Sequence, residues 1–165
     1  MIFLTVGTQF PFDRLVRAVD DWLDQNSLGE EVWAQIGDST YVPRNFEAIA
    51  SLDKAVFDRR FQQASAIISH AGMGTITMAL EHGKSLLAMP RMKKHKEVVS
   101  DHQLPLAEKF EALGHILLAR DESQLSGKFQ QLKSFVPRPR KADQDAVARC
   151  IGRFLELAAR DRKDA

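Results

Sequence analysis

Short apolar runs recur along the 165-residue chain at intervals that suit β-strands. Each run is rich in Val, Ile, Leu, Phe or Ala, and most runs end at Gly, Pro or a small polar residue, as strands followed by turns do. The predicted strands cover residues 2–6, 31–36, 46–50, 66–69, 86–89 and 115–118.

Between these runs the apolar residues recur every three or four positions, which is the spacing of an amphipathic helix. The first helix opens at Pro11, and its apolar residues share one face: Leu15, Val16, Val19 and Leu23. The other predicted helices cover residues 53–63, 75–82, about 101–113 and about 121–133. Strands that alternate with helices in this way predict an α/β fold with a doubly wound parallel sheet.

The end of the chain has a different pattern. Residues 136–141 (VPRPRK) predict a stiff, basic linker between a domain at 1–135 and an amphipathic helix at 142–165. One face of this helix carries apolar side chains, namely Val147, Ile151, Phe154, Leu155 and Ala158. This face packs back on the domain, docks on another protein, or does both in part.

Composition narrows the class of protein. The chain has 23 basic and 22 acidic residues, and this balance argues against a general nucleic-acid binder. Cys150 is the single cysteine, which excludes an internal disulfide and suits a reducing compartment. No apolar run reaches the roughly 18 residues that a membrane span needs, and the start, MIFLTVGTQ, lacks the basic residues of a signal peptide. We therefore expect a soluble intracellular protein.

Residues 66–83 (AIISHAGMGTITMALEHG) predict a strand, a glycine turn and a helix. The turn Gly72-Met73-Gly74 lets the backbone approach a ligand closely. The free N–H groups of the helix's first turn and the positive end of its dipole then attract an anion. Thr75 either caps this helix or donates a hydrogen bond to a phosphate oxygen.

The first predicted strand ends in a second glycine turn, Gly7-Thr8-Gln9. This turn either supplies N–H groups and a hydroxyl to a diphosphate or is a plain connection to the helix. It lacks the GxGxxG and GxxxxGK[ST] patterns, which disfavours an NAD-dependent oxidoreductase and a P-loop kinase. Ligands bind at the carboxyl ends of parallel strands, so both glycine turns and His70 should line one cleft, with His70 in a structural or a chemical role.

Cations and polar residues follow the fifth strand. Arg91 comes directly after this strand and is the cation best placed to neutralise a diphosphate or a sugar carboxylate. It opens a basic loop at residues 91–97 (RMKKHKE) that is solvated, closes over an anionic donor or faces anionic lipid.

A third polar group stands at the start of the next helix. Pro105 belongs in a first helical turn, so Asp101, His102 and Gln103 lie at the mouth of this helix. They either bind neutral sugar hydroxyls, for which Gln and His supply donors and acceptors, or form a cap with polar surface neighbours.

Three of these segments together resemble a known family. The motifs VGTQ, SHAGMGT…ALEHGK and DHQLPLAEK occur in that order over about residues 1–120. With them the chain resembles catalytic subunits of bacterial exopolysaccharide or capsule glycosyltransferases. It is also similar to the catalytic subunit of the split UDP-N-acetylglucosamine transferase that extends dolichol-linked sugar, and to the C-terminal half of the lipid II-forming transferase (glycosyltransferase family 28 C-terminal domain).

The resemblance implies a Rossmann-like domain that forms the nucleotide-sugar half of a two-domain GT-B enzyme. The acceptor half is then a separate, membrane-associated polypeptide. Together the two chains are expected to move a sugar from a UDP-sugar, with inversion, to a polyprenyl-diphosphate-linked acceptor at the inner face of the plasma membrane. Because no acidic DxD pair stands at a predicted strand end to hold Mg²⁺ or Mn²⁺, we expect no metal ion and no other cofactor.

The resemblance also suggests residue roles. Gly7 and Thr8 help to seat the diphosphate or the sugar, while His102 and Gln103 hold the sugar hydroxyls. The family places a ribose-binding glutamate five residues before the glycine that ends the helix, and here that position is Met78. Glu81, one turn further on, either takes over this role or is a solvated helix-end glutamate.

The general base of such a transfer is open between Asp13, His70 and a residue of the partner. We favour the partner, because the family takes its base from the acceptor half. A second hypothesis of another class is a non-catalytic subunit that binds or senses a nucleotide sugar.

Overall fold

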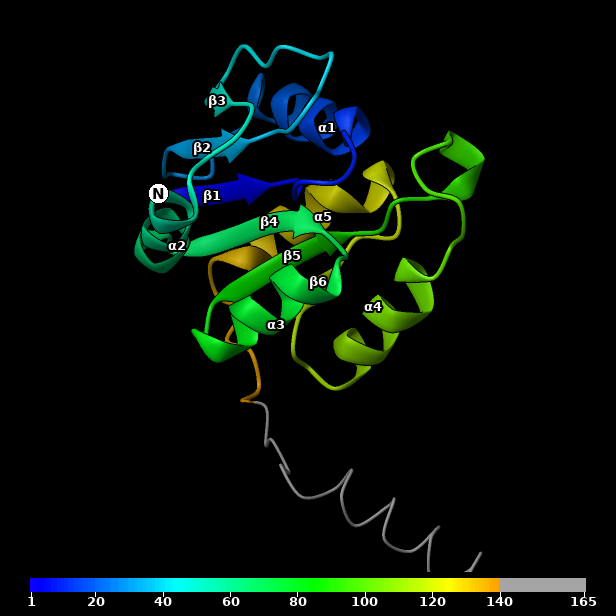
Figure 1. The fold of residues 1–165 in the computed structure, drawn as a ribbon. Coiled ribbons are helices and arrows are strands. Elements are labelled where there is room, and N and C mark those ends of the chain that lie inside the picture. The colour runs from blue at the N-terminus through cyan, green and yellow to red at the C-terminus, as the bar shows by residue number, and fades with distance from the viewer. Residues whose placement is uncertain (140–165) are drawn as a thin grey trace, which may run out of the picture.

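The structure is a computed structural model, and it describes residues 1–139. Within that range six parallel strands form one sheet in the order β3-β2-β1-β4-β5-β6 (Figure 1). The strands are β1 (Ile2–Thr5), β2 (Val32–Gln35), β3 (Glu47–Ile49), β4 (Ala66–His70), β5 (Ser85–Met89) and β6 (Leu117–Leu118). Every predicted strand is present, and the predicted doubly wound sheet is confirmed.

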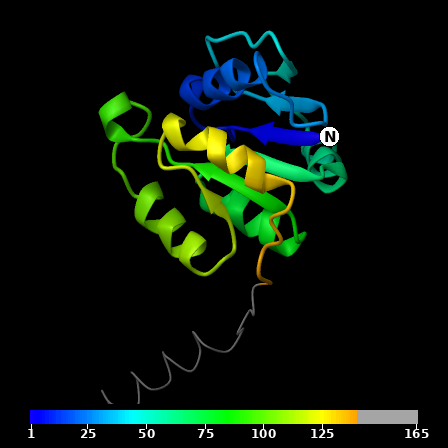
Figure 2. The ribbon, with the colours of Figure 1, turned by 180° about the vertical axis from the view of Figure 1, so that it is seen from behind.

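Helices cover both faces of the sheet. Side chains of α1 (Asp13–Leu23) and α5 (Glu122–Leu132) enter the core on one face, and both helices lie in front of the sheet in Figure 2. The other face is covered by α2 (Lys54–Gln63), α3 (Met73–Glu81) and α4 (Gln103–Ala112). A short 3₁₀ turn, η1 (Lys93–His95), lies in the loop between β5 and α4.

The central strands are largely apolar because both of their faces are buried, whereas the edge strand β3 is exposed. In β1, Ile2 and Leu4 belong to the core under α1 and α5, while Phe3 belongs to the core under the other helices. All three side chains are fully buried. Continuous apolar runs are typical of parallel sheets that are covered on both sides.

The strand order determines where a ligand can bind. From β1 the chain continues through α1 to β2 on one side, and β4 pairs with β1 on the other side. The loops after β1 and β4 therefore leave the sheet in opposite directions and open a crevice between them. Both predicted glycine turns, at residues 7–9 and 72–74, follow these two strands.

One predicted helix boundary is placed differently, and one residue of the predicted linker contacts the domain. The third helix begins at Met73 with Gly72 as its N-cap residue, so the alternative that Thr75 caps this helix is wrong. In the predicted linker, the backbone N–H of Arg138 donates to the carbonyl of Gly114 at 2.9 Å, and the carbonyl of Arg138 lies 2.7 Å from Nδ1 of His115. The start of this segment is thus bound to the domain. The helix expected at residues 142–165 lies outside the described residues.

A buried carboxylate holds the connection between β2 and β3 against α1. Asp20 is fully buried and accepts hydrogen bonds from the hydroxyl of Tyr41 at 2.6 Å and from the backbone N–H groups of Arg44 and Asn45 at 3.0 and 2.8 Å. Burial by itself would raise the pKa of Asp20, but these hydrogen bonds to the charged form hold that pKa below its ordinary value. The connection is therefore anchored by one ionised side chain.

Replacing this carboxylate tests the anchor. Asp20→Asn presents an amide N–H group where the loop presents donors, so it should lower the free energy of unfolding by about 2–3 kcal/mol in urea denaturation. The exposed neighbour provides a matched control, because Asp21→Asn should change that free energy by less than about 0.5 kcal/mol. Equal effects of the two substitutions would contradict the anchoring role.

Candidate nucleotide-sugar site

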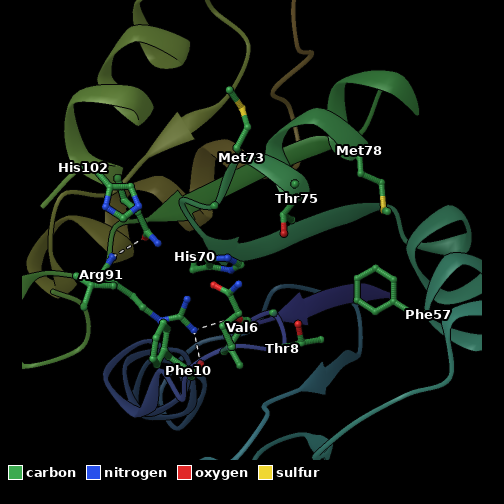
Figure 3. Close-up of a pocket in the computed structure, with 16 residues that line it drawn as sticks. Val6, Thr8, Phe10, Phe57, His70, Met73, Thr75, Met78, Arg91 and His102 are labelled. Carbon is green, nitrogen blue, oxygen red and sulfur yellow. Dashed lines mark hydrogen bonds between the residues drawn. The ribbon is translucent and has the colours of Figure 1, made fainter. Parts of the chain in front are cut away.

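Most of the site residues predicted from the sequence surround one cavity. It has a volume of about 420 Å³ and opens at the carboxyl edge of the sheet, between the loops after β1 and β4 (Figure 3). It is lined by Val6, Gly7, Thr8, Gln9, Phe10, Phe57, His70, Gly72, Met73, Gly74, Thr75, Met78, Arg91, Val98, His102 and Gln103. Both glycine turns and most of the predicted site residues therefore meet in space.

The first turn of α3 faces this cavity. The N–H of Ile76 bonds to the carbonyl of Gly72 at 3.1 Å, which leaves the N–H groups of Met73, Gly74 and Thr75 without a partner inside the helix. Because the helix begins at Met73, the Thr75 side chain lies within this first turn and points into the cavity in Figure 3. The first turn thus offers several donors and the positive end of the helix dipole to an anion.

The imidazole of His70 lies between the two glycine turns. A Cβ atom on Gly7 would stand 2.8 Å from its Cε1, and a Cβ on Gly72 would stand 2.2 Å from its Nε2. Both distances are shorter than real contacts allow, so the ring occupies space that any side chain at these positions would need. Gly7 also has φ +77°, which disfavours other residues. Both glycines are therefore required by the packing of this ring.

The charge state of His70 follows from this packing. Burial, followed by the neighbouring cation of Arg91, lowers the pKa of His70 to about 4. The ring is therefore neutral at pH 7, and its buried Nδ1 makes no hydrogen bond to the described residues. A group with so low a pKa is a weak general base at neutral pH, so the structure favours the structural role over the chemical one.

Arg91 holds the first glycine turn in place from the end of β5. Its Nη2 donates to the carbonyl oxygens of Val6 at 2.7 Å and Phe10 at 2.5 Å, as the dashed lines in Figure 3 show. Burial lowers its pKa to about 10, so the side chain remains a cation at pH 7. The cation adds positive potential to the cavity while its donors bind backbone.

The start of α4 forms the polar end of the cavity. The side-chain Oε1 of the buried Gln103 accepts a hydrogen bond from the backbone N–H of Arg91 at 3.0 Å, and this bond ties α4 to β5. The exposed ring of His102 lies at the rim, with its Nδ1 2.9 Å from the hydroxyl of Ser100. Both side chains thus line the cavity as predicted, and the amide N–H₂ group of Gln103 is in position to meet a polar ligand.

Three predicted site residues do not line this cavity. Asp13 binds the hydroxyls of Ser39 and Thr40 at 2.6 and 2.5 Å, and these bonds outweigh burial and lower its pKa. Asp101 accepts a hydrogen bond from the backbone N–H of Lys93 at 2.6 Å. Glu81 is exposed at the end of α3.

Two apolar side chains complete the wall: Met78, at the family's ribose-binding position, and Phe57, which the sequence pattern did not indicate. Phe57 lies in α2, and its ring packs against Phe3 and Phe61 with centroids 5.4 and 5.9 Å apart. It faces Met78 of α3 across one end of the cavity (Figure 3). In the sequence, Phe57 and Phe61 have the spacing of an ordinary core stripe, so no signal separates the ligand-facing ring from the buried one.

Charge in the cavity has one sign. No Asp or Glu occurs among the described residues that line it, whereas Arg91 does. A cavity of this charge favours an anionic ligand.

Across residues 1–139, no three His, Cys, Asp or Glu side chains are grouped closely enough to hold a metal ion. No described helix combines the length and apolar character that crossing a membrane requires.

The chain belongs to the family described as the glycosyltransferase family 28 C-terminal domain, whose model matches residues 1–152. It is 36% identical over 124 residues to the human protein called UDP-N-acetylglucosamine transferase subunit ALG13, and 36% identical over 123 residues to the mouse protein. The matches cover 70% and 69% of this chain and 10% of each relative. The chain thus spans about a tenth of the length of these relatives.

Solved structures agree on the fold. MurG from Acinetobacter baumannii has a TM-score of 0.61 at 18% identity, with 81% of this chain and 42% of that chain covered. The solution structure of ALG13 has a TM-score of 0.57 at 18% identity, with 86% and 89% covered. The predicted Rossmann-like fold of one GT-B half is confirmed, as is the predicted membership of family 28.

His70 should make stability depend on pH. Its pKa is about 6.5 in the unfolded chain and about 4 in the folded one, so the unfolded state binds more protons between these values. Above about pH 6.5 the titration of His70 does not reduce the free energy of unfolding. As the pH falls towards 4, proton binding by the unfolded chain reduces that free energy progressively. Between pH 7 and 4 the free energy of unfolding should therefore fall by about 3 kcal/mol more in the unmodified protein than in His70→Gln.

Urea denaturation at a series of pH values measures this difference. His102→Gln, at the exposed rim of the same cavity, is the matched control and should keep the steeper fall of the unmodified protein. The same pH dependence in His70→Gln and in the unmodified protein would show that the imidazole is not held neutral by the fold.

Proposed function

We propose that this chain is the donor-binding subunit of an inverting, metal-independent glycosyltransferase. With a membrane-associated partner, it transfers the sugar of a UDP-sugar to a polyprenyl-diphosphate-linked acceptor in exopolysaccharide biosynthesis. The observation that carries this proposal is the cavity between two glycine turns, with free helix N–H groups, one buried cation and no carboxylate among its described lining residues. The similarity to proteins called transferase subunits supports it.

The donor diphosphate binds at the centre of the cavity in this proposal. The N–H groups of Met73, Gly74 and Thr75 bind its oxygens, and Arg91 supplies a fixed positive charge. When the bond between the anomeric carbon and the β-phosphate oxygen breaks, negative charge grows on that phosphate. Preorganised dipoles stabilise this charge without having to reorient, which is the role that a metal ion has in other transferases.

The acceptor hydroxyl attacks the anomeric carbon from the face opposite the leaving diphosphate, so the configuration inverts. Its proton passes to a base supplied by the partner. Two properties of the described residues support this source: His70 has a pKa of about 4, and the Asp13 carboxylate is hydrogen-bonded outside the cavity. The same properties favour the alternative, a non-catalytic subunit that binds or senses a nucleotide sugar.

Nucleotide binding without metal is the first test. In isothermal titration with EDTA present, UDP should bind, whereas NAD and ATP should bind at least tenfold more weakly. Gly74→Val should weaken UDP by more than tenfold, because its side chain would extend over the free N–H groups. Gly127→Val in α5 is the matched control, since a Cβ at either glycine meets no atom of the described residues within 4 Å. Binding that needs Mg²⁺, or equal losses in both variants, would contradict the proposed site.

Transfer itself tests the need for a partner. Radiolabelled UDP-sugars are supplied to membranes from the source organism with this chain's gene deleted, and label in the extracted lipid is counted. Adding the purified chain should restore lipid labelling, and the chain with extracted lipid but no membrane protein should give none. Transfer by the chain alone would overturn the split enzyme. Nucleotide binding without any restored transfer would favour the sensor.

A further inference from the structure

The side chains at the two ends of the cavity differ, although the aromatic ring of Phe10 lies at the same end as Arg91 (Figure 3). Arg91 and His102 lie at one end, and Phe57 and Met78 lie at the other (Figure 3). The glycine turns, with the hydroxyl of Thr75, lie between them. A ligand that spans the cavity therefore meets a polar end, an anion-binding centre and an apolar end.

The chemistry of a nucleotide sugar matches this order better in one direction than in the other. Sugar hydroxyls need donors and acceptors, which the polar end supplies through His102 and Gln103. A pyrimidine base has an apolar, stackable face that suits an aromatic wall. With the diphosphate at the centre, the nucleoside thus lies toward Phe57 and Met78.

The ribose occupies the space between the base and the diphosphate. Met78 comes three residues after Thr75 in α3, so it lies one turn along the same side of the helix whose first turn faces the diphosphate. The ribose is therefore adjacent to a thioether, which is at most a weak hydrogen-bond acceptor. Glu81, the nearest following carboxylate in this helix, is exposed and does not line the cavity.

The apolar end is held firmly in place. The ring of Phe57 is fixed by its contacts with Phe3 and Phe61, and Met78 packs against the same core. Among the described residues that line the cavity, none carries a carboxylate that could accept a hydrogen bond from a ribose hydroxyl. The hydroxyls of Thr8 and Thr75 belong to the turns at the centre.

A site rejects an analogue that lacks a hydroxyl only when it has a polar group that the analogue leaves unpaired. On the basis of the proposed function, we propose that the nucleoside end does not distinguish ribose from 2′-deoxyribose, because Met78 faces the sugar ring. The donor class of this chain then includes dTDP-sugars as well as UDP-sugars.

Isothermal titration with UDP, 2′-deoxy-UDP and dTDP tests this directly. The dissociation constants of the unmodified protein for the three should agree within about threefold. Met78→Glu introduces an acceptor beside the ribose, so UDP should then bind at least about tenfold more tightly than 2′-deoxy-UDP. The ratio is the readout, since a new negative charge near the diphosphate weakens both nucleotides.

Two control variants accompany this substitution. Met78→Leu keeps the wall apolar and Glu81→Gln removes the exposed carboxylate, and both should leave the ratio near one. If Met78→Glu does not fold, Met78→Gln supplies an uncharged acceptor at the same place, with a smaller preference for UDP expected.

A preference of the unmodified protein for UDP above about tenfold would overturn the inference while leaving the donor site intact. Loss of such a preference in Glu81→Gln would identify Glu81 as the ribose acceptor instead. An unchanged ratio in both Met78→Glu and Met78→Gln would show that the ribose lies elsewhere. Failure of all three nucleotides to bind would instead contradict the proposed function itself.

Discussion

The contact of one imidazole ring with two glycine turns is the constraint on which the site depends. His70 ends β4, and its ring fills the space that a side chain at Gly7 or Gly72 would occupy. The turn after β1 and the turn before α3 therefore both pack against the same ring, close to its Cε1 and Nε2 atoms. Arg91 adds a second tie, since it binds backbone carbonyls of the first turn from the end of β5. Three neighbouring strand ends are thus held in one geometry.

This packing has an electrostatic consequence. The site buries a cation beside a neutral ring and includes no carboxylate among its described lining residues, so the charge of Arg91 is compensated in part by Glu97, outside the cavity lining. Burial lowers the pKa of both groups, which means that the fold destabilises their charged forms. An anion bound between the turns would oppose this effect, and the free N–H groups of α3 point to the same kind of ligand. Anion binding would therefore stabilise the charged form of Arg91.

Much of this arrangement could be predicted from the sequence, because it depends on short-range patterns. Apolar runs and glycine turns are local features, and the rule that parallel strands meet at one edge was enough to bring residues 7–9, 70 and 72–75 together. The start of one helix differs from the prediction: α3 begins two residues before Thr75, because Gly72 adopts an extended conformation and takes the N-cap position.

The direction in which individual side chains point could not be predicted from the local sequence pattern. Asp13 follows the first glycine turn closely in sequence, yet its carboxylate binds the loop after β2, and Asp101 binds the loop that carries η1. The ring of Phe57 is positioned at the cavity by its contact with Phe3, which joins residues that are distant in sequence. Such contacts depend on the finished tertiary structure.

The central claim is that a nucleoside diphosphate binds between the two glycine turns. The most direct measurement is a titration of ¹⁵N-labelled protein with UDP, in the presence of EDTA, followed by the backbone amide signals. We expect the largest shifts at Gly7, Thr8, Met73, Gly74 and Thr75, whose N–H groups lie in those turns and in the first turn of α3. Shifts concentrated at another edge of the sheet, or no shifts at millimolar UDP, would contradict it.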